Sequence, residues 1–62
     1  MKPEIQPLLD YDATAALLGI TPRLARKLVE KREISSVKIG RLTRVEPGAV
    51  AEYIERRRRD AL

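Results

Sequence analysis

The sequence contains no cysteine and no histidine, and its only aromatic residues are Tyr11 and Tyr53. The absence of cysteine excludes a disulfide framework and a cysteine-based zinc site. The absence of histidine removes the commonest acid–base group and metal ligand of proteins. The carboxylates are scattered and no Gly-rich phosphate loop is present, so we expect no enzyme activity, metal or cofactor. No apolar run approaches the ~20 residues that span a bilayer, and Pro3, Glu4 and Pro7 interrupt any signal peptide. These absences predict a soluble, intracellular protein.

The length of the chain limits the size of its core. Its 62 residues suffice for one domain. A chain this short buries only about 60% of the surface that its unfolded form exposes, and here the core must be aliphatic. We expect one domain over residues 1–62, with a flexible lead-in at 1–7, a core at 8–55 and a basic C-terminal tail at 56–62.

The net charge of +4 is concentrated in the middle of the chain. Residues 23–44 hold eight Lys or Arg against two Glu, whereas residues 1–22 carry a net charge of −2 and residues 45–62 are neutral. A concentrated basic patch attracts polyanions and speeds their association. This pattern favours nucleic acid as the partner, with an anionic membrane surface or an acidic protein as alternatives.

The stretch from Leu17 to Val29 predicts two helices joined by a tight turn. Gly19 tolerates the positive φ that ends a helix, Thr21 is a good N-cap, and Pro22 suits the first helical position. A helix, a short Gly-containing turn and a capped second helix are typical of helix-turn-helix proteins, whose second helix enters the DNA major groove. An ordinary corner between two helices is the alternative, and the positive charge of the second helix favours DNA.

The second helix is expected from Pro22 to about residue 31. Its core-facing positions follow i, i+3, i+4, i+7 spacing and are Ala25, Leu28, Val29 and Arg32. The opposite side presents Arg23, Arg26, Lys27 and Glu30, and its three cations can all reach into one groove. A solvated charged face is the alternative, although charges of nearly one sign make it a weaker explanation.

A β-hairpin is expected after this helix. Val37–Ile39 and Leu42–Val45 alternate apolar and polar residues around the turn Gly40-Arg41. So few strand residues require support from the helices. In a helix-turn-helix protein such a hairpin is a wing, with Arg41 at its tip beside phosphates or in the minor groove. We also expect the hairpin to close the core through Val37, Ile39 and Val45.

Two further helices are expected at the ends of the chain. Asp10 is a plausible N-cap for a helix over Tyr11–Leu18, and Pro47 opens the last helix. The arginines at positions 56–59 suit the negative end of a helix dipole. They are equally consistent with a second phosphate or partner contact.

Taken together, these segments resemble the small excisionase-type winged-helix domains, which are relatives of the MerR-like DNA-binding domain. The resemblance covers nearly the whole chain, and its most specific parts are the turn within Leu17–Arg23 and the wing sequence Val37–Arg41. It implies a mostly α fold with a small β-hairpin, a winged helix-turn-helix. It also implies sequence-specific binding to double-stranded DNA.

Phage excisionases, also called recombination directionality factors, bind repeated sites beside an attachment site cooperatively. They bend the DNA and direct a tyrosine integrase toward excision. The resemblance therefore implies double-stranded DNA, a phage tyrosine integrase and neighbouring copies of the chain as partners, in the cytoplasm of a bacterial host cell. A small winged-helix transcriptional regulator, repressor or activator, is the nearest alternative. A basic protein-interaction module is a second one.

The expected DNA contacts form two groups. The group for the major groove consists of Thr21, Pro22, Arg23, Arg26 and Lys27. The group for phosphates and the wing consists of Arg32, Lys38, Arg41, Thr43 and Arg44. If these residues neutralise six or so phosphates, log K should fall with log salt with a slope of roughly −5.

Overall fold

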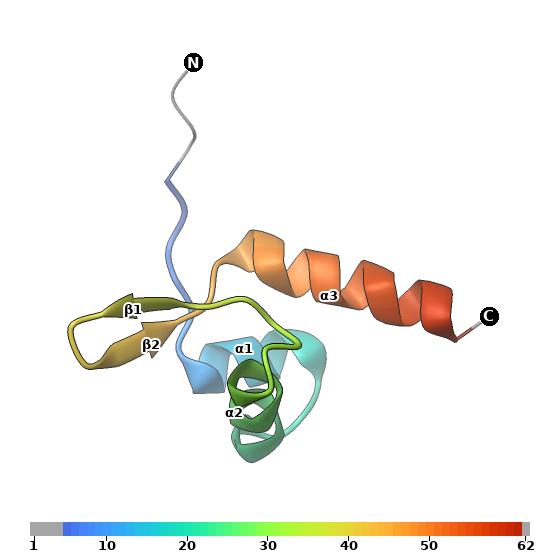
Figure 1. Ribbon diagram of the computed structural model, residues 1–62, viewed down its shortest axis with the longest axis horizontal. Coiled ribbons are helices and arrows are strands. Elements are labelled where there is room, and N and C mark those ends of the chain that lie inside the picture. The colour runs from blue at the N-terminus through green and yellow to red at the C-terminus, as the bar shows by residue number, and fades with distance from the viewer. Residues whose placement is uncertain (1–4, 62) are drawn as a thin grey trace.

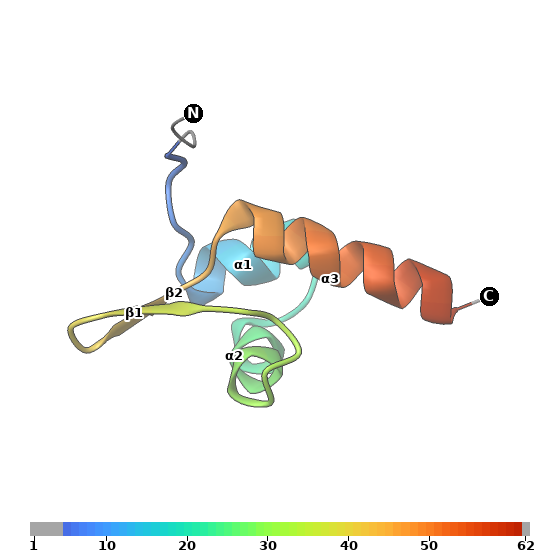
Figure 2. The same cartoon turned by 45° about the horizontal axis from the view of Figure 1, so that its top comes forward.

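The computed structural model describes residues 5–61. The elements are, in order, α1 (Tyr11–Leu18), α2 (Pro22–Glu30), β1 (Val37–Ile39), β2 (Leu42–Arg44) and α3 (Pro47–Asp60). Helix α1 packs against both α2 and α3, while the hairpin and the C-terminal half of α3 extend from opposite ends of the molecule (Figures 1 and 2). The predicted winged helix-turn-helix fold is confirmed. The expected lead-in at 1–7 lies partly outside the described residues.

Local signals determine both ends of α1. Asp10 Oδ1 accepts a hydrogen bond of 2.7 Å from the backbone N–H of Ala13, as an N-cap does. Gly19 takes a φ of 69°, and the N–H groups of Gly19 and Ile20 donate to two carbonyls in the last turn. This Schellman motif satisfies the end of α1 and redirects the chain toward α2.

Helix α2 begins as predicted and ends differently. Thr21 Oγ1 accepts a hydrogen bond of 3.1 Å from the backbone N–H three residues later, and Pro22 occupies the first helical position. The helix ends at Glu30, and Arg32 takes a φ of 63°, so the expectation that Arg32 continues the apolar face is wrong. The N–H groups of Arg32 and the next residue donate to α2 carbonyls at 3.0 and 2.9 Å. Arginine thus occupies the left-handed position of a second Schellman motif, where glycine is usual.

The hairpin has the predicted two-residue turn. Gly40 has a φ of 61°, whereas Arg41 is not among the residues with positive φ, which makes the turn type II′. The register pairs Val37 with Arg44, Lys38 with Thr43 and Ile39 with Leu42. Beyond β2, two backbone hydrogen bonds of 2.8 Å join Val45 to Leu9. The base of the hairpin is therefore tied to the segment before α1.

The core lies at the base of the hairpin and draws on α2, the loop after it, the residue that follows β2, and α3. Its buried cluster consists of Val29, Ile34, Val45 and Val50. Small buried residues, Ala15 of α1 and Ala25 of α2, accompany the packing of these two helices. An all-aliphatic core was predicted, and the structure adds Ile34 to it. Ile34 comes two residues after the left-handed Arg32 and is fully buried.

The expectation that the hairpin closes the core is right for Val45 and wrong for Ile39. Val45 is 1% exposed and Val37 is half-buried, whereas Ile39 is 54% exposed. Ile39 precedes the turn directly, so it lies at the end of the hairpin farthest from the helices. At that distance its side chain cannot reach the cluster.

Helix α3 continues through the arginine run to Asp60. The Arg56 guanidinium donates to the carbonyl of Glu33, lies 3.6 Å from the Glu33 carboxylate, and sits 5.7 Å from the centre of the Tyr53 ring. Such contacts are consistent with a structural role for the first arginine of the run. They link α3 to the turn that ends α2.

Candidate nucleic-acid interface

Helix α2 packs against α1 with one side and exposes the other side to solvent. Ala25 and Val29 are buried, which fixes the core-facing side of the helix. Arg23, Arg26 and Lys27 are all exposed on the other side, as their spacing predicts. Helix α2 thus carries three of the expected DNA-contacting cations on its accessible surface.

A groove runs between α2 and the hairpin. Its charged lining comprises the cations Arg26, Arg32, Lys38, Arg41 and Arg44 and one carboxylate, Glu30. Clefts lined by charge of one sign focus the electrostatic field and concentrate counter-ions. The structure therefore brings six expected site residues, the five cations and Thr43, around one strongly basic surface, while Arg23 and Lys27 lie outside the lining.

Arg26 and Glu30 form an ion pair within α2. Arg26 Nε lies 2.9 Å from Glu30 Oε2, with the two side chains 65% and 60% exposed. The hydrogen bond to Glu30, and then its charge, raises the pKa of Arg26 above its ordinary value. Arginine is a permanent cation near neutral pH, so Arg26 keeps its charge whether or not it is paired. Because exposed pairs of this kind contribute little, Arg26 can exchange Glu30 for another anion at small cost.

The wing residues do not all face the same way. Residues directly opposite in an antiparallel pair share a face, so Lys38 and Thr43 lie on one face of the hairpin. Arg44 is opposite Val37, on the other face, and is half-buried with its Nη1 donating to the Thr43 carbonyl at 2.8 Å. Lys38 and Arg41 are exposed and are therefore the freer cations of the wing.

The N-terminus of α2 is exposed at Thr21 and Pro22. The Thr21 oxygen accepts the capping hydrogen bond, which leaves its hydroxyl hydrogen able to donate to an anion. The first N–H groups of a helix lack intrahelical partners and favour negative charge. This end of α2 is therefore suited to a phosphate oxygen.

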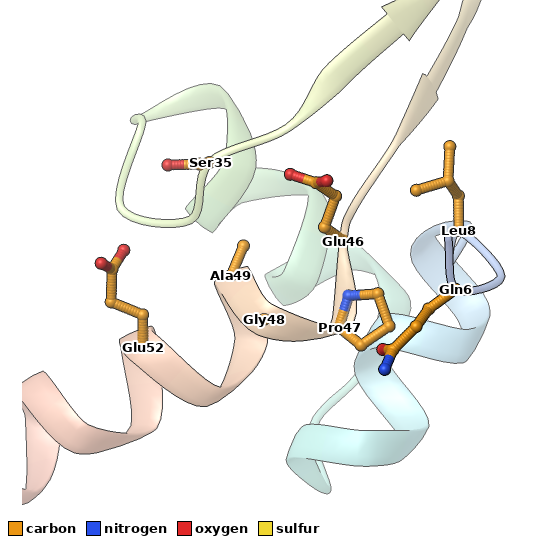
Figure 3. Close-up of a pocket in the computed structure, with 8 residues that line it drawn as sticks. All are labelled: Gln6, Leu8, Ser35, Glu46, Pro47, Gly48, Ala49 and Glu52. Atoms are coloured by element: carbon orange, nitrogen blue, oxygen red, sulfur yellow. The ribbon is translucent and has the colours of Figure 1, made fainter. Parts of the chain in front are cut away.

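A second hollow lies at the start of α3 (Figure 3), and Ser35 lines both it and the groove between α2 and the hairpin. It is bounded by Gln6 and Leu8 of the segment before α1 and by Pro47 at the first turn of α3. Its charged side chains are the carboxylates Glu46 and Glu52. Its negative charge disfavours a polyanion, so the α2–wing groove is the better candidate for nucleic acid.

Two features of the basic surface were not predicted. Glu30 was expected on the charged side of the second helix, but its ion pair with Arg26 was not, although the i, i+4 spacing could have indicated it. Ile39 and Leu42 are exposed beside the turn rather than buried, which a two-residue turn could have indicated, since it places both at the tip.

No helix within residues 5–61 is long and apolar enough to cross a membrane. Among the same residues, no cluster of acidic side chains has the arrangement needed to hold a metal ion.

Residues 8–58 match the family model described as "Helix-turn-helix domain". Because the match covers most of the chain, the protein belongs to the helix-turn-helix domain family. No curated protein and no solved structure matches the chain. Fold, family and surface charge together support double-stranded DNA as the ligand.

Proposed function

We propose that the protein is a sequence-specific architectural DNA-binding protein of the excisionase type. It binds repeated sites near an attachment site cooperatively, bends the DNA and directs a phage tyrosine integrase toward excision. The observation that carries the DNA-binding part of this proposal is the α2–wing groove, whose lining holds five cations and one carboxylate. The excisionase part is supported by the resemblance of the turn and wing sequences.

In this proposal α2 lies in the major groove. Arg23, Arg26 and Lys27 face the base edges, where an arginine can pair with guanine O6 and N7. Thr21 and Pro22, at the positive end of α2, approach a phosphate and set the register of the helix on the duplex.

The residues of the wing group contact the DNA backbone or the minor groove next to the major groove that α2 enters. Arg32, at the end of α2, and Lys38 and Arg41 of the wing hold phosphates, and Thr43 and Arg44 support the wing from its two faces. A domain of this size buries at most ~1,000 Å² on DNA, so one copy binds modestly and neighbouring copies help one another.

Selection of duplexes from a random pool tests sequence-specific recognition. We expect one sequence class to be enriched, with a log–log salt slope of roughly −5. Arg26→Ala should weaken binding to the selected duplex and relax its sequence preference. Arg59→Ala is a matched control, because it removes the same charge from the far end of α3. Equal binding of wild type and Arg26→Ala would refute recognition by this face of α2.

Footprinting the selected sequence in the source genome separates the excisionase from the regulator. Directly repeated sites beside an attachment core, filled cooperatively, together with stimulation of excision by the integrase, are the expected results. A lone site over a promoter would instead assign the protein as a transcriptional regulator.

A further inference from the structure

The tip of the hairpin carries two exposed apolar side chains. Ile39 is 54% exposed and Leu42 is 53% exposed, and the register places them directly opposite each other. They therefore share one face of the hairpin, immediately before and after the turn. Neither belongs to the core cluster or to the partly buried residues packed against it. The hairpin projects from the body of the molecule (Figures 1 and 2).

The charged residues of the hairpin are all positive. Between Ile34 and Val45 the chain has no carboxylate, and its cations are Lys38, Arg41 and Arg44. Arg41 lies in the turn itself, between the two apolar residues. A ligand for this tip must therefore offer negative charge at its rim and apolar surface just inside it. The minor groove of duplex DNA has that arrangement, with phosphates along its edges and stacked bases between them.

We infer that the tip of the wing is an apolar wedge that enters the minor groove and bends the duplex. Ile39 and Leu42 contact the bases at one step, while Lys38 and Arg41 hold the phosphates on either side. The inference rests on the proposed DNA-binding function and adds the mechanism of bending. Isoleucine and leucine are among the side chains that minor-groove proteins insert between base steps, which unstacks the step and kinks the DNA.

The dimensions of the hairpin explain why bending must accompany insertion. Two paired strands lie about 4.8 Å apart before their side chains are counted, and the minor groove is only about 6 Å wide. The tip enters only when the groove widens, and a widened minor groove accompanies a bend toward the major groove. Pyrimidine–purine steps unstack most easily, so the wedge favours a TA or CA/TG step at its site.

The test uses the full chain and the best duplex from the random-pool selection, with 2-aminopurine at the contacted step and a donor–acceptor dye pair on its ends. Wild type should raise the 2-aminopurine fluorescence and shorten the distance between the ends. The double variant Ile39→Thr/Leu42→Thr places a β-branched residue, which suits a strand, at both positions. It should lose both signals and bind about tenfold more weakly, with an unchanged salt slope.

Two controls keep the test decisive. Lys38→Thr removes a phosphate contact and should reduce the salt slope while the 2-aminopurine signal persists at saturation. If circular dichroism shows that the double threonine variant is unfolded, Ile39→Val/Leu42→Val shortens the wedge with less disturbance and should reduce both signals.

Normal unstacking and bending by a folded double variant would overturn the wedge and leave DNA binding intact. Failure of wild type to bind any selected duplex would overturn the proposed function itself. Binding of wild type, but not of the double variant, to anionic vesicles in preference to the duplex would assign the tip to a membrane instead.

Discussion

Replacing Arg32 with glycine should stabilise the fold and weaken DNA binding at the same time. Arg32 has a φ of 63° at the end of α2, a conformation that costs a residue with a Cβ roughly 1–2 kcal/mol. Glycine avoids this cost and loses about 0.5–1 kcal/mol more backbone entropy on folding than a residue with a side chain. The difference predicts that Arg32→Gly is more stable by about 0.5–1 kcal/mol, which raises the Tm of so small a domain by roughly 2–8 °C.

The same substitution removes a cation from the α2–wing groove, in which no ion pair to Arg32 is present among residues 5–61. If Arg32 holds one phosphate, its loss should make the log–log salt slope less negative by about 0.9. Urea unfolding followed by circular dichroism and DNA titrations at several salt concentrations measure the two effects. Arg32→Ala is the matched control, because it removes the same contact but keeps the Cβ, and it should gain no stability. A less stable Arg32→Gly protein would refute the reasoning about the backbone.

Three further substitutions are expected to have measurable effects. Glu30→Ala removes the one carboxylate of the groove and should tighten DNA binding about two- to fivefold, measured by titration, whereas unchanged or weaker binding would contradict a phosphate beside it. Thr14 is fully buried and its hydroxyl has no partner among the described residues, so Thr14→Val should stabilise the protein by about 1 kcal/mol in urea unfolding. A loss of stability would indicate a hydrogen bond to that hydroxyl. Gly19→Ala should cost about 1 kcal/mol, because the φ of 69° opposes a Cβ although nothing lies within 4 Å of it; an unchanged Tm would refute this cost.

The helix starts and the hairpin turn could be predicted because their signals are local. Asp10, Thr21 and Pro22 act on neighbouring backbone groups, and Gly40 determines the turn type within two residues. The left-handed end of α2 could not be predicted, because no glycine marks it: Arg32 adopts a conformation that its residue type disfavours. Hydrogen bonds from the backbone N–H groups of Arg32 and Glu33 to carbonyls of α2 hold this conformation. Ile34, the next residue, is buried in the core.

Contacts between segments that are distant in the sequence could not be predicted from local sequence patterns. The pairing of Leu9 with Val45 joins segments that are far apart in the sequence. Period-two alternation alone cannot say where the hairpin extends beyond the core, as the exposed Ile39 shows. The charged face of α2 followed from its periodicity. Which of those cations share a groove with the wing depends on the angle between α2 and the hairpin, so Arg26 lines the groove and Arg23 does not.

The most direct test of the central claim is an NMR titration of the labelled protein with the selected duplex. We expect the amide shift changes to cluster at the N-terminus of α2, at Arg32 and along the hairpin, including Ile39 and Leu42. The hollow around Glu52 should stay unchanged. Shift changes confined to α3 and that hollow would contradict DNA binding through α2 and the wing and would place the binding surface at α3.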